Sequence, residues 1–124
     1  MKTLTHLAAG VLLATLALVG ATKTAMAQDQ VKVAPNNTKV LLENDRVRVL
    51  DVQTKPGEKT AMHSHPAYLV YSLSTSKAKF TSPDGKTTEG ELKAGAVNWH
   101  EVETHAMENV GTTDSHVLVI ELKK

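Results

Sequence analysis

The stretch AMHSHPAYLVYSL, residues 61–73, places two histidines one residue apart at the start of an apolar run that is flanked by tyrosines. Alternate residues of a β-strand point to the same face of the sheet, with Cα atoms roughly 6.5–7 Å apart. Two imidazoles at this spacing can meet at one metal ion, at about 2.0–2.1 Å each for zinc. The spacing of His63 and His65 therefore predicts a strand that carries part of a metal site.

Short strand-like segments continue on both sides of this stretch. Residues 39–44 and 46–54 are rich in Val and Leu and alternate with period two, which favours strand over helix. Pro56-Gly57 marks a turn, and Pro83-Asp84-Gly85 between two strand-like runs predicts a hairpin. The remaining strand-like segments are residues 77–82, 86–92, 96–111 and 116–123.

Seven to nine short strands with no helical periodicity predict an all-β fold, a single-domain antiparallel jelly-roll β-barrel. An immunoglobulin-like sandwich is the alternative, but it gives no reason for the placement of the histidines.

The first 27 residues have the order of a secretory signal peptide. Lys2 is followed by an apolar run over residues 7–19 and by Ala25-Met26-Ala27, an A-x-A cleavage site. The run is too short for the roughly 20 residues that span a bilayer. We expect cleavage after Ala27 and export to the periplasm or beyond, with no membrane attachment afterwards. An N-terminal anchor or a buried helix is the alternative.

The mature chain, residues 28–124, has a nearly balanced charge and no cysteine. Its 12 basic and 13 acidic residues leave about −1. Without a basic face, nucleic acid is not an expected partner. The absence of cysteine excludes disulfides, thiolate nucleophiles and thiolate metal ligands. We expect residues 28–38 to form a flexible lead-in and residues 39–124 to form one domain.

His105 is the best candidate for a third metal ligand. In the period-two segment THAMENVG, residues 104–111, it shares a face with Met107 and Asn109. Met107 either fills the core or adds a soft copper ligand. His100 lies in a polar bend and His116 at the start of the last strand, so neither is expected to be a ligand.

Residues 56–73 and 92–111 resemble the two sequence motifs of the cupin superfamily. The first motif has a glycine, five residues and then His-x-His, as in Gly57 and residues 63–65. The second has a glycine followed by His and, four positions on, Asn, which Gly95, His105 and Asn109 match. The resemblance covers about residues 47–122. It implies a jelly-roll barrel that holds a divalent metal inside its mouth through His63, His65 and His105.

The chain departs from the cupin pattern in two places. The bend at residues 101–103 lacks the proline and glycine of the family. The family's glutamate is also missing: Tyr68 occupies its place, or Leu69 if the alignment shifts by one residue. A site of three histidines without a carboxylate suits Fe, Ni, Zn or Cu, and it resembles that of some cupin-like dioxygenases.

Three functions remain open from the sequence. The first is a metal-dependent oxygenase that acts on a small molecule, with Tyr68, Trp99 and Met107 shaping the substrate pocket. The second is a non-catalytic module that binds a metal or a small ligand, with periplasmic copper handling as a variant. The third is a fold retained without a working site. We also expect a homodimer, because a small domain without disulfides gains stability from covering a sheet face.

Overall fold

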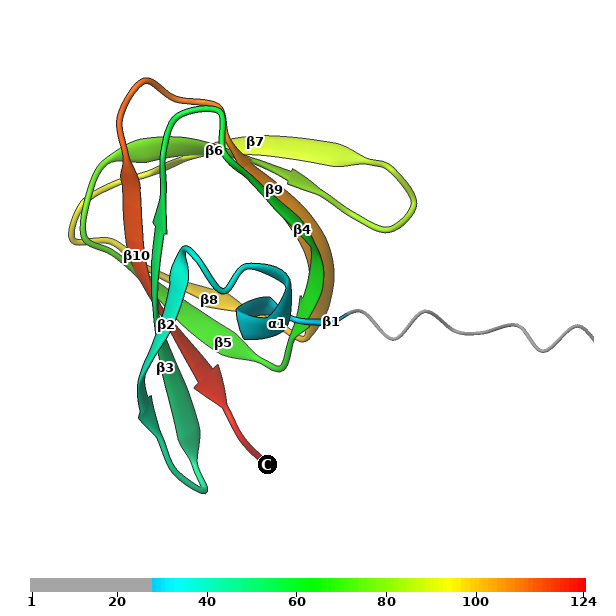
Figure 1. Ribbon diagram of the computed structural model, residues 1–124, viewed down its shortest axis with the longest axis vertical. Helices are drawn as coiled ribbons and strands as arrows, with labels where there is room; N and C mark the ends of the chain where they lie inside the picture. Colours follow the sequence, from blue (N-terminus) through cyan, green and yellow to red (C-terminus); the bar gives the residue numbers. More distant parts are fainter. Residues whose placement is uncertain (1–27) are drawn as a thin grey trace, which may run out of the picture.

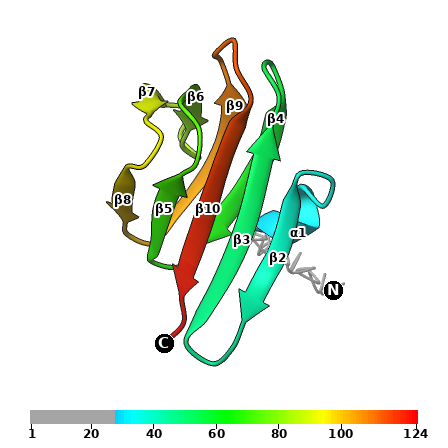
Figure 2. The ribbon, with the colours of Figure 1, turned by 90° about the vertical axis from the view of Figure 1, so that its left-hand side faces the viewer.

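Two five-stranded sheets make up the part of the protein that the computed structural model describes, residues 28–124 (Figures 1 and 2). The predicted signal peptide lies outside these residues. One sheet has the strand order β1-β4-β9-β6-β7 and the other β2-β3-β10-β5-β8. The elements are β1 (Gln28–Asp29), α1 (Gln30–Val33), β2 (Thr38–Glu43), β3 (Val47–Thr54), β4 (Lys59–His65), β5 (Tyr68–Ser72), β6 (Ser76–Thr81), β7 (Thr87–Leu92), β8 (Val97–His100), β9 (Glu103–Asn109) and β10 (Ser115–Leu122).

The predicted all-β jelly-roll fold is confirmed, with one correction. Every strand pair is antiparallel except β1 with β4, which is parallel. The two sheets are not joined by hydrogen bonds into the closed barrel that we expected. Within residues 28–124 each sheet keeps two edge strands, because no ladder links β1 or β7 to β2 or β8.

The hairpin predicted at residues 83–85 joins β6 to β7. Gly85 has a φ of +86°, a conformation that costs a glycine little because it has no Cβ. The Asp84 side chain accepts a hydrogen bond from the Lys86 backbone N–H at 3.1 Å, which fixes the turn.

The core lies between the sheets and comes mostly from the inner face of the second one. Along β10, buried residues alternate strictly with half-buried ones, so Val117, Val119 and Glu121 point inward. Leu50 and Val52 of β3 pack against these valines. The period-two pattern of the sequence therefore corresponds to the burial pattern of the strands.

Residues 28–38, expected to be a flexible lead-in, contain β1 and α1 instead. β1 pairs with β4 at His63 and Ser64. The Asp29 side chain accepts a hydrogen bond from the Val31 backbone N–H at 2.9 Å and so caps the single helical turn. Gln30 is only 4% exposed. Within the described residues, no helix has the length and apolar character to cross a membrane.

The outer faces of the two sheets differ in character. On the first sheet, the outer face carries the Ser64–Thr104 hydrogen bond and the Lys79–Glu108 ion pair. On the second sheet, one row of residues in register crosses all five strands and is entirely apolar. From β2 to β8 this row consists of Leu42, Val49, Ile120, Leu69 and Trp99.

We predict that Asn109→Ala lowers the free energy of unfolding by about 2–4 kcal/mol. The Asn109 side chain is fully buried, donates to the carbonyls of Thr54 and Thr113, and accepts from the Gly111 backbone N–H. Its loss leaves the buried Thr54 carbonyl without this donor and also removes the two part-buried bonds to Gly111 and Thr113. Urea unfolding measures the effect, with the exposed Asn36→Ala as the control. Equal stability of the two variants would contradict this role.

Candidate metal centre

Pairing between β4 and β9 brings the three predicted histidines together. His63 lies opposite His105 in the register, and His65 lies opposite Glu103. The register shifts between Thr60 and His63, where β4 contains one more residue than β9. This β-bulge puts both Thr60 and His63 on the inner face, although they are three residues apart.

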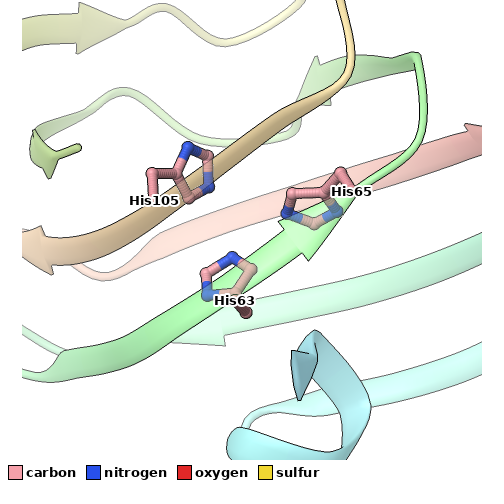
Figure 3. A group of neighbouring side chains, drawn as sticks. All are labelled: His63, His65 and His105. Atoms are coloured by element: carbon pink, nitrogen blue, oxygen red, sulfur yellow. The ribbon is translucent and has the colours of Figure 1, made fainter. Parts of the chain in front are cut away.

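The three imidazole rings point into the same space between the sheets (Figure 3). Their ring centroids lie 4.8 Å apart for His63–His65, 4.8 Å for His63–His105 and 5.3 Å for His65–His105. All three are buried, and one ring nitrogen from each lies within 4.8 Å of the others. One ring nitrogen from each histidine could therefore bind the same metal ion.

Each ring has a neighbour at its outer nitrogen. The Nδ1 of His63 donates to the carbonyl of Ala61, inside the bulge, at 2.7 Å. The Nδ1 of His65 lies 2.8 Å from a carboxylate oxygen of Glu121, and the Nδ1 of His105 lies 3.2 Å from Glu103. Partners of this kind fix the tautomer and leave Nε2 with its lone pair for a metal.

The environment favours the neutral form of two of these rings, His63 and His105. Burial lowers the pKa of His63 below its ordinary value. Burial, followed by the neighbouring His63, lowers the pKa of His105 to about 4. A neutral imidazole is the form that binds a metal ion, so these two rings need no deprotonation at neutral pH.

A chain of buried charges lies behind His65. Glu121, 2% exposed, accepts a hydrogen bond from the guanidinium of Arg48 at 2.6 Å, and Arg48 also pairs with Asp29 of β1. A buried carboxylate is costly unless it is paired and hydrogen-bonded, and here both conditions hold. The chain connects a candidate ligand to β10, β3 and the N-terminal strand.

Polar side chains form a second hydrogen-bonded cluster around Glu103. One of its oxygens accepts the hydroxyl of Tyr68 and lies 3.3 Å from Nδ1 of His100. The rings of Tyr68 and His100 stack with centroids 4.7 Å apart. Burial and the bond to Glu103 raise the pKa of Tyr68, so the phenol keeps its proton at neutral pH.

A cavity of about 300 Å³ adjoins the three histidines. Its wall is mostly apolar and comes from both sheets. The aliphatic and aromatic residues that line it are Val52, Val70, Phe80, Leu92, Trp99, Met107, Val117 and Val119. A polar end at the histidines and an apolar body are typical of small-molecule sites.

All six candidate site residues that the sequence predicted lie in the described part of the chain, at or beside the cavity. His63, His65 and His105 form the cluster, and Tyr68 and Met107 line the cavity. Trp99 lines the cavity as well, but 52% of it is exposed.

The other histidines have different surroundings. His100 ends β8 and stacks on Tyr68 at the edge of the cluster, without belonging to it. His116 pairs with Asp51 at 2.9 Å, away from the cavity.

Sequence reasoning missed the carboxylates that contact the cluster. Glu103 lies two residues before His105, so period two would have placed it on the same face as that ligand. Glu121 follows Val117 and Val119 on the inner face of β10 by the same rule. Gln30 could not be found in this way, because it comes from a segment with no strand pattern.

The donor set fits a first-row divalent metal. Three imidazole ligands suit Fe, Ni, Zn or Cu, whereas Mg²⁺ and Ca²⁺ prefer oxygen ligands. Two carboxylates at the outer nitrogens, Glu103 and Glu121, add negative charge near the place that a cation would take. His63, His65 and His105 could therefore hold such an ion.

Known structures resemble this chain, although no family model and no curated protein match it. A cupin domain from Bordetella pertussis Tohama I is 27% identical with a TM-score of 0.65; the match covers 70% of this chain and 92% of that one. A predicted oxalate decarboxylase from Thermotoga maritima is 26% identical with a TM-score of 0.50, over 68% and 78% of the two chains. An RmlC-like cupin from Methanocaldococcus jannaschii, 14% identical over 69% and 78% with a TM-score of 0.56, shows the same fold.

The chain belongs to the cupin superfamily. In this cupin neither carboxylate beside the histidines comes from the strand that follows His-x-His, where Tyr68 stands. Glu103 comes from β9 and contacts the outer nitrogen of His105, and Glu121 comes from β10 and contacts the outer nitrogen of His65.

We predict that Glu103→Gln weakens metal binding by about 10–100-fold. The amide keeps the shape of the side chain but loses the negative charge beside the His105 ring. Competition with a chromogenic chelator measures the affinity. Glu101→Gln, an exposed glutamate in the same bend, is the matched control and should bind as the wild type does. Unchanged affinity in Glu103→Gln would show that this carboxylate has no part in the site.

Proposed function

We propose that this cupin binds a divalent metal ion through His63, His65 and His105 and acts there on a small molecule held in the adjacent cavity. The observation that carries the proposal is the cluster itself, three buried rings with occupied outer nitrogens beside a cavity of about 300 Å³. Three protein ligands would leave coordination positions open, as catalytic metal sites do. Fe, Ni, Zn and Cu are the candidate metals.

The reaction class that we propose is oxygenation. A bound metal would supply a Lewis acid or a redox centre. The chain's own part is to bind and orient the substrate. The apolar wall would exclude water from the substrate, and the phenol of Tyr68, held by Glu103, offers a fixed dipole at the polar end.

A non-catalytic metal-binding role is the second candidate, and the position of Met107 favours its copper variant. Met107 lines the same cavity as the three histidines, and a thioether is a ligand that suits Cu(I). In either case the signal-like residues 1–27 support the proposal that the protein works in the periplasm or outside the cell.

We also propose that two copies pair through the outer face of the β2-β3-β10-β5-β8 sheet, whose strands lie side by side in Figure 2. The five strands contain 31 residues, and at about 3.3 Å per residue and about 4.8 Å between strands they give each copy a face of about 500 Å² in projection. This is smaller than the roughly 800 Å² per partner of a standard interface. The apolar row across the face supports this pairing, and the His116–Asp51 ion pair lies beside the row on the same face.

Metal content tests the central proposal. Protein purified after export should contain close to one equivalent of metal per chain, and His63→Ala should lose most of it. His116→Ala, which alters a histidine outside the cluster, should keep it. Metal at about 100 times its Kd should stabilise the wild type by about 2.7 kcal/mol in thermal unfolding. Equal metal in His63→Ala and the wild type would refute the site.

Oxygen uptake separates the two candidate functions. Iron-loaded protein should consume oxygen with at least one member of a panel of small acids and thiols, whereas His105→Ala should not. A panel without uptake, together with weaker retention of Cu(I) by Met107→Leu against a chelator, would favour the copper-binding role.

The dimer is tested by mass in solution. We predict that the wild type has the mass of two chains in light scattering and that Leu69→Lys, within the apolar row, has the mass of one. Lys79→Leu, which changes the outer face of the other sheet, should stay dimeric. A monomeric wild type would refute this pairing.

A further inference from the structure

Two residues that line the cavity each carry a buried side-chain oxygen without a hydrogen-bond partner. The oxygens are Oε1 of Gln30 and Oγ1 of Thr60, in residues that are 4% and 3% exposed. Four other buried hydroxyls within residues 28–124 also lack a partner, but their residues do not line the cavity. They belong to Thr54, Ser72, Ser76 and Ser115.

A β-bulge positions Thr60 at the cavity, and Gln30 lies there as the first residue of α1. Thr60 faces inward together with His63 because the β-bulge between them shifts the register by one residue. Gln30 begins α1, which β1 fixes next to β4 by pairing at His63. Both side chains thus reach the cavity from the neighbourhood of a candidate metal ligand.

An unpartnered buried oxygen is costly. Leaving such a group without a hydrogen bond loses its full desolvation free energy, and an apolar side chain of the same shape would remove that cost. Most buried polar groups in proteins do have a partner. Because both residues line one cavity, a molecule bound there could supply the missing partner of each oxygen.

We infer that Gln30 and Thr60 form a second binding position, which takes a hydrogen-bond donor of the bound molecule. The inference rests on the proposed function, because the other end of that molecule is held at the metal. The amide oxygen of Gln30 can only accept, and the hydroxyl of Thr60 can accept or donate. The ligand class is a small, largely apolar molecule with a metal-binding group at one end and a hydroxyl or amine away from it.

The probes are short carboxylic acids offered to the zinc-loaded full-length mature chain. The series runs from 3-hydroxypropanoate to 6-hydroxyhexanoate, and each acid is paired with the alkanoate that has a methyl group in place of the hydroxyl. Calorimetry gives both affinities. For at least one length, the hydroxy acid should bind about tenfold more tightly than its methyl counterpart.

Three variants locate the source of that preference. Gln30→Met and Thr60→Val keep the approximate shape but remove the polar atom, and each should reduce the preference to about twofold. Thr54→Val removes an unpartnered hydroxyl of the same kind outside the cavity and should leave the preference intact. No preference at any length, or a preference that persists in both Gln30→Met and Thr60→Val, would overturn the inference.

Thermal unfolding of the metal-free protein gives a second readout. Gln30→Met and Thr60→Val should not lower the melting temperature, because each removes a polar atom without a partner. A clear decrease in both would show that these oxygens serve the fold, and the inference would fail. If zinc binds but no hydroxy acid is preferred, only this inference fails; if zinc does not bind, the proposed function fails with it.

Discussion

One extra residue in β4 allows the histidines of this strand to form a candidate metal site. In a regular strand, Thr60 would share its face with Met62 and Ser64, and the two histidines would point away from the core. The bulge between Thr60 and His63 reverses the faces, so His63 and His65 turn inward. The free carbonyl of Ala61 in that bulge then holds the ring of His63. A single irregularity thus sets both the direction and the orientation of the first ligand.

The remaining structure holds this cluster in place before any metal is bound. Glu121 of β10 fixes His65 and is itself paired with Arg48 of β3, which also contacts Asp29 of β1. Three strands that are distant in the sequence therefore converge on one imidazole. A buried carboxylate without a partner would be strongly destabilising. The same ion pairs that stabilise the fold therefore also hold the ring of His65 in its position.

Much of the site could be predicted, because strands repeat every two residues. That rule grouped His63 with His65 and placed His105 with Met107 on the opposite strand. It also groups Glu103 with His105. The first cupin motif, in contrast, points only to Tyr68, which stands at the position of the missing glutamate. In the structure, the hydroxyl of Tyr68 donates a hydrogen bond to Glu103. The residue at the position of the missing glutamate therefore contacts the carboxylate on β9.

The sequence by itself determined the all-β class, the turns and the identity of the three histidines. The reason is that the alternation of apolar and polar residues, and the Gly and Pro residues at turns, are local properties of the chain. The tertiary structure alone decided that two sheets face each other without closing into a barrel, that Gln30 lines the cavity, and that Glu121 contacts the ring of His65. Those outcomes depend on register and on contacts across many residues. Such contacts are set by the packing of strands, which no short stretch of sequence encodes.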